Sequence, residues 1–135
     1  MSNKIILILG IIALLVGCQQ AKSTEEPKVK KGMVKVSILY PNGEGKTFDM
    51  DYYTQKHMPM MANIFGDSLK LLTIEKGTGS GIPDTPTPFL AIGCFYFDKL
   101  STYQNAVRAN LDKIRADIPK YTNIQPVIQI SEVQR

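Results

Sequence analysis

The feature that most constrains the fold of this chain is a run of nine apolar residues at positions 89–97, Phe-Leu-Ala-Ile-Gly-Cys-Phe-Tyr-Phe. Its length is that of a β-strand rather than of a helix. Because the side chains of a strand alternate between its two faces, this strand is apolar on both sides. Such strands occur where a sheet is covered above and below, so we expect a sheet with cover on both faces.

Three weaker patterns predict the remaining strands. Alternating apolar and polar residues at 33–40 indicate one, and apolar segments at 69–76 and 126–133 indicate two more. Residues 77–88 are rich in glycine, proline and threonine, and neither a helix pattern nor a Gly-Lys-Ser/Thr sequence follows the glycines. We interpret this long segment as a mobile flap rather than a phosphate-binding loop.

The first helix is expected to begin at Asp49, whose carboxylate can accept a hydrogen bond from a free N–H of the first turn. Pro59 has no N–H to donate, and it biases Met58 away from helical geometry. We therefore predict that the helix ends or kinks near His57 and restarts at Pro59. It is expected to stop at Gly66, because glycine is common just after helix ends.

A second helix is expected to begin with Ser101 as its cap and to end within residues 117–122, which include Pro119. Its apolar residues recur at helical spacing and predict one buried stripe, formed by Tyr103, Val107, Leu111, Ile114 and Ile118. The order of elements is then β-α-β-β-α-β. This is the ferredoxin-like pattern, which belongs to the α+β class.

This order leaves one face of the predicted sheet uncovered. Two helices pack on the same face of such a sheet, whereas the strand at 89–97 is apolar on both faces. A large exposed apolar face is unfavourable in a soluble monomer. We therefore expect a homodimer in which two sheets pack face to face, with a cavity between sheet and helices.

The first residues are typical of an export signal. Lys4 is followed by an apolar run over residues 5–16, which is short for a membrane-spanning helix. The run ends in Leu-Val-Gly-Cys, which resembles the lipobox of bacterial lipoproteins. Residues 1–17 are then removed, and lipidated Cys18 anchors the protein to a membrane surface of the cell envelope. Gln19 is compatible with the outer membrane in a Gram-negative cell. The alternative is an ordinary signal peptide with an incidental cysteine.

Residues 18–32 are polar, contain no aromatic residue and are interpreted as a flexible tether. The whole chain holds 16 basic and 12 acidic side chains, of which the first 32 residues contribute five and two. The remaining domain, residues 33–135, therefore has 11 basic and 10 acidic side chains and a net charge of +1. This balance argues against a nucleic-acid-binding surface, which needs clustered basic charge.

The cysteine and histidine content argues against several kinds of site. With Cys18 lipidated, Cys94 has no partner for a disulfide, and its apolar surroundings indicate a small buried side chain rather than a nucleophile. The one histidine, His57, has no cysteine or carboxylate at metal-ligand spacing, so we expect no zinc site. No nucleophile elbow is present, which argues against Ser-His-Asp chemistry.

His57 is the first candidate for a functional residue. It is expected at a helix break, four residues from Tyr53 and on the same face. An imidazole titrates near neutral pH, so a histidine in this position can act as a general acid or base. The alternative is a structural role, in which His57 caps the helix end and satisfies a buried hydrogen bond.

Four parts of the sequence together resemble the EthD family, named for a protein linked to ethyl tert-butyl ether degradation, within the dimeric α+β barrel superfamily. They are residues 33–41, residues 48–53 with 57–59, residues 117–122, and residues 125–131. The resemblance spans nearly all of residues 33–135 and implies a ferredoxin-like domain that pairs into a dimeric barrel. The leader departs from the family pattern, which is a bare cytoplasmic domain.

The resemblance implies only a broad activity. Members of the family are often labelled reductases or oxidoreductases, and relatives in the superfamily include cofactor-free monooxygenases, isomerases, cyclases and haem-handling proteins. No established catalytic set carries over to this chain. His57 is singled out because it lies in a matching segment.

Three functions are therefore open. The first is an oxidoreductase or isomerase without a cofactor that acts on a small, mostly apolar, oxygen-bearing molecule, with His57 moving a proton and Tyr53 or Tyr121 orienting the substrate. The second is a carrier or sensor of a hydrophobic ligand at the cell envelope, favoured by the tether and by the lack of a second strong catalytic side chain near His57. The third is a haem-handling protein with His57 as axial ligand.

Overall fold

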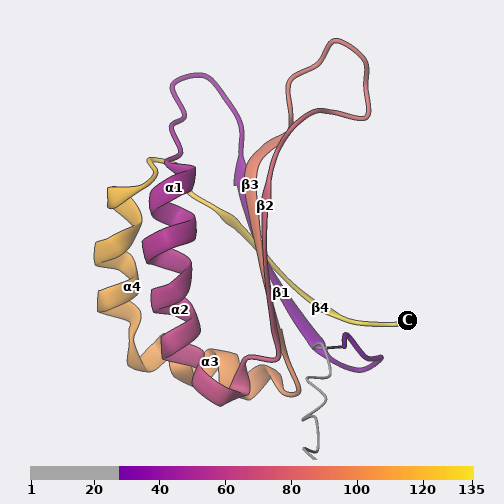
Figure 1. Cartoon of the computed structure of the whole chain (residues 1–135), viewed down its shortest axis with the longest axis vertical. Helices are drawn as coiled ribbons and strands as arrows, with labels where there is room; N and C mark the ends of the chain where they lie inside the picture. Colours follow the sequence, from indigo (N-terminus) through magenta and orange to yellow (C-terminus); the bar gives the residue numbers. More distant parts are fainter. Residues whose placement is uncertain (1–27) are drawn as a thin grey trace, which may run out of the picture.

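The computed structural model describes residues 28–135 and places a sheet on one side and helices on the other (Figure 1). In chain order the elements are β1 (Val34–Pro41), α1 (Met50–Tyr52), a π-helical segment (Tyr53–His57), α2 (Met58–Phe65), a 3-10 turn (Gly66–Ser68), β2 (Leu71–Lys76), β3 (Phe89–Phe97), α3 (Leu100–Ala109), α4 (Leu111–Asp117), a second 3-10 turn (Ile118–Lys120) and β4 (Val127–Glu132). This order confirms the predicted β-α-β-β-α-β pattern of the α+β class. The predicted signal peptide at 1–17, the lipidation site Cys18 and the tether up to residue 27 lie outside the described residues.

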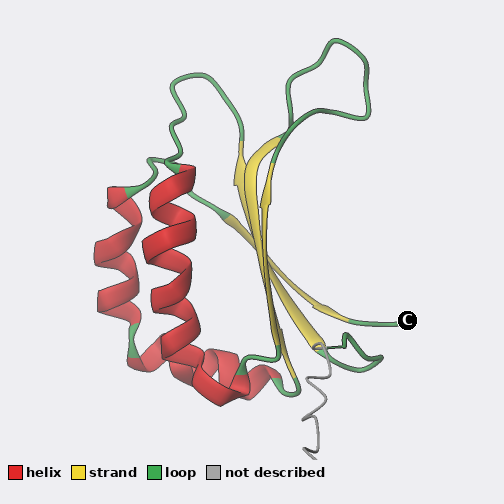
Figure 2. Cartoon of the chain, in the orientation of Figure 1, coloured by secondary structure: helices red, strands yellow, loops and turns green. Residues whose placement is uncertain are grey.

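The four strands form one antiparallel sheet in the order β2-β3-β1-β4. The apolar strand β3 pairs with β1 on one side and with β2 on the other, so that Phe95 lies opposite both Val36 and Leu72. The helices cover a single face of this sheet (Figure 2). The strand bounds agree with the prediction at β3 and differ by one or two residues elsewhere.

The core lies between the helices and the sheet face that they cover. Alternate residues of β3 point into it, and Ala91, Phe95 and Phe97 are each at most 2% exposed. Phe95 and Phe97 pack edge-on against Phe65 of α2, with ring centroids 5.1 and 5.0 Å apart. Burying one such side chain contributes about 1.5–3 kcal/mol relative to leaving it exposed, so these contacts hold α2 against the sheet.

The opposite face of the sheet carries the other half of β3. Cys94 is buried, as predicted, and its sulfur lies 3.7 Å from the Ser37 hydroxyl oxygen. Ile92 and Tyr96 are only half-buried. Within the described part of the chain, β3 is therefore fully covered on the helix side alone, and the predicted cover of its second face requires a further layer.

The first helix begins and ends where the sequence predicts. The Asp49 carboxylate accepts a hydrogen bond from the Tyr52 N–H at 2.9 Å, which caps α1. At the other end, α2 stops before Gly66, whose φ of 53° lies in the region that glycine adopts without strain.

The helix does not end near His57 and restart at Pro59, as the sequence predicted. Met58 keeps helical backbone angles (φ −67°, ψ −37°), and the chain runs from α1 through the π-helical segment Tyr53–His57 directly into α2. The Met58 N–H donates to the Tyr53 carbonyl, five residues back in the chain. Because this wider turn accommodates a proline, the helix continues where a regular α-helix would clash with the Pro59 ring.

The second helical region differs from its prediction at its start and in its middle. Lys99 rather than Ser101 occupies the cap position, because Ser101 already lies inside the first turn of a helix that begins at Leu100. The chain then leaves helical geometry at Asn110 (φ −123°, ψ 17°), whose side-chain amide donates to the Ala106 carbonyl. Asparagine competes for backbone hydrogen bonds in this way, so α3 and α4 are two helices rather than one.

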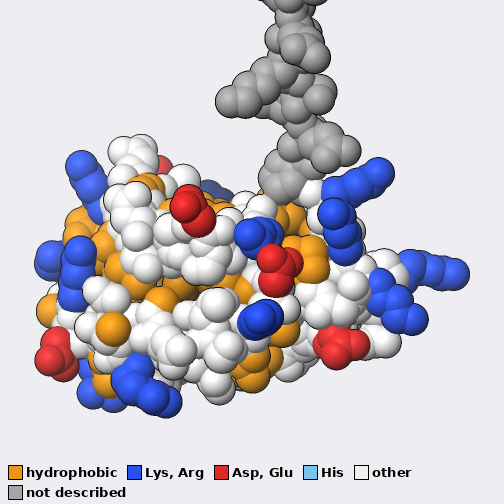
Figure 3. Space-filling model, turned by 90° about the horizontal axis from the view of Figure 1, so that it is seen from below, with side chains coloured by type: hydrophobic (Ala, Val, Ile, Leu, Met, Phe, Trp, Pro, Cys, Tyr) orange, Lys and Arg blue, Asp and Glu red, His pale blue; other side chains and the backbone are white. Residues whose placement is uncertain are grey.

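Loops and charged side chains mark the ends of the domain. Residues 77–88 form the long connection between β2 and β3, which projects beyond the sheet (Figure 1). Figure 3 shows the end of the domain opposite this loop, where basic side chains are spread around the face with apolar and uncharged groups between them.

None of the helices in residues 28–135 has the length and the apolar character that are needed to span a bilayer.

Candidate functional site

The start of α1 meets the end of α4 because the helical region α1–α2 runs antiparallel to the region α3–α4 (Figure 1). The Asp49 N–H donates to the Tyr121 carbonyl at 2.7 Å, and Phe48 forms an isolated β-bridge with Thr122. These backbone contacts hold the segment that contains His57 against the segment that ends α4.

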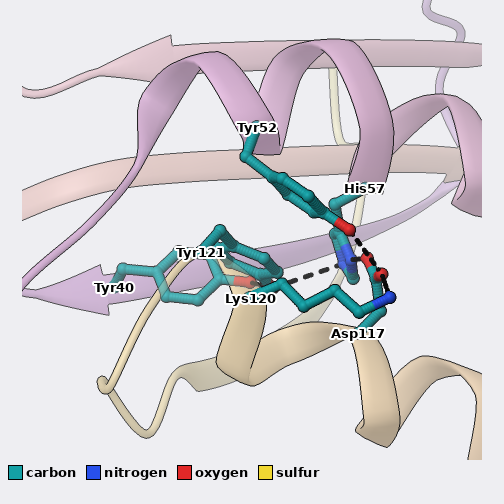
Figure 4. A network of polar contacts seen from close by, with 6 residues as sticks. All are labelled: Tyr40, Tyr52, His57, Asp117, Lys120 and Tyr121. Atoms are coloured by element: carbon teal, nitrogen blue, oxygen red, sulfur yellow. Dashed lines mark hydrogen bonds and ion pairs between the residues drawn. The ribbon is translucent and has the colours of Figure 1, made fainter.

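The Asp117 carboxylate is the centre of a polar network in this region (Figure 4). One of its oxygens, Oδ2, lies 2.9 Å from His57 Nδ1. The other, Oδ1, accepts a hydrogen bond from the Tyr52 hydroxyl at 2.9 Å and pairs with Lys120 Nζ at 3.1 Å. These charge-assisted contacts offset the cost of burying a carboxylate that is only 7% exposed.

The other side of the imidazole faces two buried phenols. Tyr121 Oη lies 3.3 Å from His57 Nε2, and Tyr40 Oη lies 2.8 Å from Tyr121 Oη. The first contact is long for a hydrogen bond, whereas the second has an ordinary length. His57 is 5% exposed and Tyr121 is 3% exposed. The chain of contacts thus runs inside the protein and reaches the surface at Lys120, which pairs with Asp117.

Burial and hydrogen bonding set the protonation states of this network. Burial lowers the pKa of His57 below its ordinary value of 6.5, and this effect outweighs the opposing hydrogen bond and charge of Asp117. Burial alone would raise the pKa of Asp117, but hydrogen bonds from His57, Tyr52 and Lys120 together hold it below the usual 3.8. At neutral pH the imidazole is therefore neutral and the carboxylate is charged.

These protonation states determine the tautomer of His57. A charged carboxylate only accepts hydrogen bonds, so the proton of the neutral imidazole lies on Nδ1 and Nε2 is left as an acceptor. Burial, followed by the neighbouring phenol of Tyr40, raises the pKa of Tyr121, so its hydroxyl stays protonated and donates to Nε2. Tyr40 in turn donates to Tyr121. The result is a basic nitrogen held in one orientation by the carboxylate behind it.

An apolar cavity of about 430 Å³ adjoins this network, between the sheet and the helices. Its volume is in the range of small-molecule sites. The stripe predicted on the second helix lines this cavity and is half-buried rather than fully buried. The polar groups on the wall are Tyr40, Tyr53, His57, Tyr103, Arg115, Tyr121 and Gln125.

Tyr53 lies against the imidazole with its ring stacked on that of His57, at 5.6 Å between centroids and 15° between planes. Its hydroxyl lies over Gly93 of β3. A Cβ added at Gly93 would collide with this hydroxyl and come within 2.8 Å of Met58 Cε. Glycine at this position therefore permits the close approach of helix and sheet. In this position the Tyr53 ring stacks on the imidazole and restricts its orientation.

The three site residues proposed from the sequence, His57, Tyr53 and Tyr121, lie together on the cavity wall. The expectation that no strong partner lies near His57 is wrong, because Asp117 is in direct contact with it. The order of elements contains a signal for this contact. Antiparallel helices place the end of the second beside the start of the first, and Asp117 is the last residue of α4.

A haem ligated by His57 would bind through Nε2, because Nδ1 is held by Asp117. The iron would take the place of the Tyr121 hydroxyl, which lies 3.3 Å from Nε2. The haem-handling hypothesis stays a prediction.

Solved structures that resemble this chain include two EthD proteins. One is an EthD-like protein from Ralstonia eutropha JMP134, with 38% sequence identity, a TM-score of 0.73, and a match that covers 78% of this chain and 97% of that one. The other is an ethyl tert-butyl ether degradation (EthD) family protein from Bacillus halodurans C-125, with 23% identity, a TM-score of 0.53, and coverage of 76% and 99%. No protein-family model and no curated protein matches the chain.

Proposed function

This chain belongs to the EthD-like family, and on that premise we propose that it is an enzyme of the oxidoreductase or isomerase type that moves a proton on a small, mostly apolar, oxygen-bearing molecule. His57 is the base, Asp117 orients it, and Tyr121 and Tyr53 position the substrate. One observation carries the proposal. A neutral imidazole, backed by a buried carboxylate, lines an apolar cavity of about 430 Å³.

The proposed step begins when the substrate replaces the long Tyr121 contact at His57 Nε2. Nε2 takes a proton from an acidic O–H or C–H group, and the electron pair of that bond stays on the substrate as a phenolate or enolate. The Tyr121 hydroxyl donates to the new oxygen anion, while Asp117 stabilises the imidazolium. Return of the proton to a different atom gives an isomer. Loss of electrons to an external acceptor such as dioxygen gives an oxidised product.

Turnover of a panel of phenols, quinols and enones in D₂O tests this proposal, with mass spectrometry to detect deuterium uptake and products. We expect His57→Gln to lower the rate by roughly 10²–10⁴, the usual contribution of a positioned general base. Lys56→Gln changes an exposed neighbour in the same π-helical segment and is expected to keep the wild-type rate. Equal rates for the wild type and His57→Gln across the panel would contradict the proposed role of the imidazole.

A non-catalytic carrier or sensor of a hydrophobic ligand is the second candidate. One observation favours it. Within residues 28–135, no buried side-chain nitrogen or oxygen lacks a hydrogen-bond partner, so the network is satisfied without a ligand. A ligand that binds tightly in the cavity and yields no product by mass spectrometry would select this function.

We also propose that two chains pair through the sheet face opposite the helices. The half-buried apolar residues Leu39, Ile92 and Tyr96 lie on that face and support the proposal, because pairing would cover them. Sedimentation of the protein at several concentrations tests it, and Ile92→Glu is expected to dissociate the pair. A wild type that remains monomeric at high concentration would contradict it.

The lipid anchor at Cys18 remains a prediction, together with a place at the cell envelope and, in a Gram-negative cell, at the outer membrane. A labelled fatty acid is expected to be incorporated into the wild type and not into Cys18→Ala. Absence of label from both proteins would favour an ordinary signal peptide.

A further inference from the structure

Arg115 is the one permanently charged side chain on the cavity wall. It lies on α4, is exposed, and makes no ion pair or side-chain hydrogen bond within residues 28–135. The dipole of α4 favours a basic residue in its last turn, but it does not account for a position on the wall of an apolar cavity. The guanidinium is therefore available to a molecule that enters.

The exposed lining residues show where the cavity opens. Arg115 and Gln125 are exposed, and so is Ile128 of β4, at 53%, whereas His57 and Tyr121 are buried. The mouth therefore lies between α4 and the start of β4. A molecule that fills the cavity has its inner end at His57 and its outer end near Arg115 and Gln125.

We propose that the ligand is a small amphipathic acid with an apolar body, a hydroxyl or carbonyl oxygen at its inner end, and a carboxylate at its outer end that binds Arg115. This inference rests on the function proposed above for the same cavity and names the class of its substrate. The planar guanidinium matches a carboxylate because two of its N–H groups can donate parallel hydrogen bonds. The Gln125 amide can donate a third. No acidic side chain lines the cavity to compete for Arg115.

Fluorescence titration of the full chain tests the inference with two probes. The first is 6-hydroxy-2-naphthoate, which carries a hydroxyl and a carboxylate at opposite ends of an apolar body, and the second is its uncharged methyl ester. At pH 7.5 we expect the wild type to bind the acid on the order of tenfold more tightly than the ester, since the charge-assisted contact is partly exposed to solvent.

Two variants make this comparison specific. Arg115→Met is expected to abolish the preference for the acid and to leave the affinity for the ester unchanged. Arg108→Met removes another exposed arginine, in the last turn of α3, which does not line the cavity. This matched control is expected to keep the preference of the wild type.

Equal affinity of the wild type for acid and ester overturns the inference, and so does a preference that survives in Arg115→Met. Binding of neither probe also overturns it, because the cavity then rejects the proposed class of ligand. The proposed proton transfer is judged separately. Binding of the acid without turnover would support the carboxylate site at Arg115 and contradict the proposed enzymatic activity. Turnover of neutral compounds only, with loss of that turnover in His57→Gln, would support the enzymatic activity and contradict the carboxylate site.

Discussion

Asp117→Asn tests how the imidazole is held. Asparagine has nearly the same shape as aspartate, but it carries no charge and presents an NH₂ donor in place of one oxygen. Its remaining oxygen can still accept from Tyr52 and Lys120, which leaves the NH₂ group facing Nδ1 of His57. Because Nδ1 carries a proton in the wild type, two donors then face each other unless the imidazole moves its proton to Nε2.

The expected cost follows from these contacts. The buried hydrogen bond between His57 and Asp117 is charge-assisted, and bonds of that kind contribute about 1.5–3 kcal/mol. The Lys120 pair adds little, since the lysine side chain is 58% exposed. A neutral bond regained through the second tautomer offsets part of the loss. We expect the free energy of unfolding to fall by about 1–3 kcal/mol, which lowers the Tm by roughly 4–8 °C per kcal/mol for a domain of this size.

Two measurements check this prediction. Urea unfolding gives the difference in free energy, and the nitrogen-15 chemical shifts of the only histidine report which ring nitrogen carries the proton. We expect the proton on Nδ1 in the wild type and on Nε2 in Asp117→Asn, with turnover reduced in the variant. Asp112→Asn changes an exposed carboxylate in the first turn of α4 and serves as the control. A wild type with its proton on Nε2, or an Asp117→Asn protein with unchanged tautomer and stability, would refute the reasoning.

Three further outcomes concern stability. Because folding lowers the pKa of His57, the unfolded chain takes up its proton first as the pH falls below 6.5. The free energy of unfolding, measured with urea, is therefore expected to keep its full value above pH 6.5 and to decrease as the pH falls toward the pKa of His57 in the folded protein. The His57→Gln protein is expected to lack this decrease. Gly93→Ala is expected to lower the free energy of unfolding by about 1–3 kcal/mol, because the added Cβ collides with the Tyr53 hydroxyl. An unchanged free energy of unfolding would show that helix and sheet can move apart without cost. Asp49→Ala removes the cap of α1 and is expected to cost about 0.5–2 kcal/mol in the same assay, most of which Asp49→Ser should restore.

Local patterns predicted the strands well because each pattern reflects burial of that segment. The nine residues of β3 are an example, since their apolar character on both faces predicted both the strand and its bounds. The predictions of the helices were wrong where the hydrogen bonds depart from the regular α-helical pattern. At Met58 the chain shifts to an i→i+5 bond, and at Asn110 a side chain bonds to the backbone of the preceding turn. No residue propensity predicts the first shift, whereas the low helix propensity of asparagine is a signal for the second.

The site was predictable only in part. His57 and Tyr53 share one helical segment, so their proximity follows from spacing alone. Asp117 is 60 residues away from His57, and its contact depends on how the two helices are aligned. That alignment comes from backbone contacts such as Asp49 to Tyr121, which no local pattern reveals. The segments at 48–53, 57–59 and 117–122, which carry the resemblance to the EthD family, supply most of the residues of the network.

A crystal structure with the ligand that co-purifies with the protein, or with 6-hydroxy-2-naphthoate, tests the proposed site most directly. We predict a ligand inside the cavity, with an oxygen within hydrogen-bond distance of His57 Nε2 or Tyr121 Oη. A ligand bound outside the cavity, or one that fills it without contacting either residue, would contradict proton transfer by this imidazole.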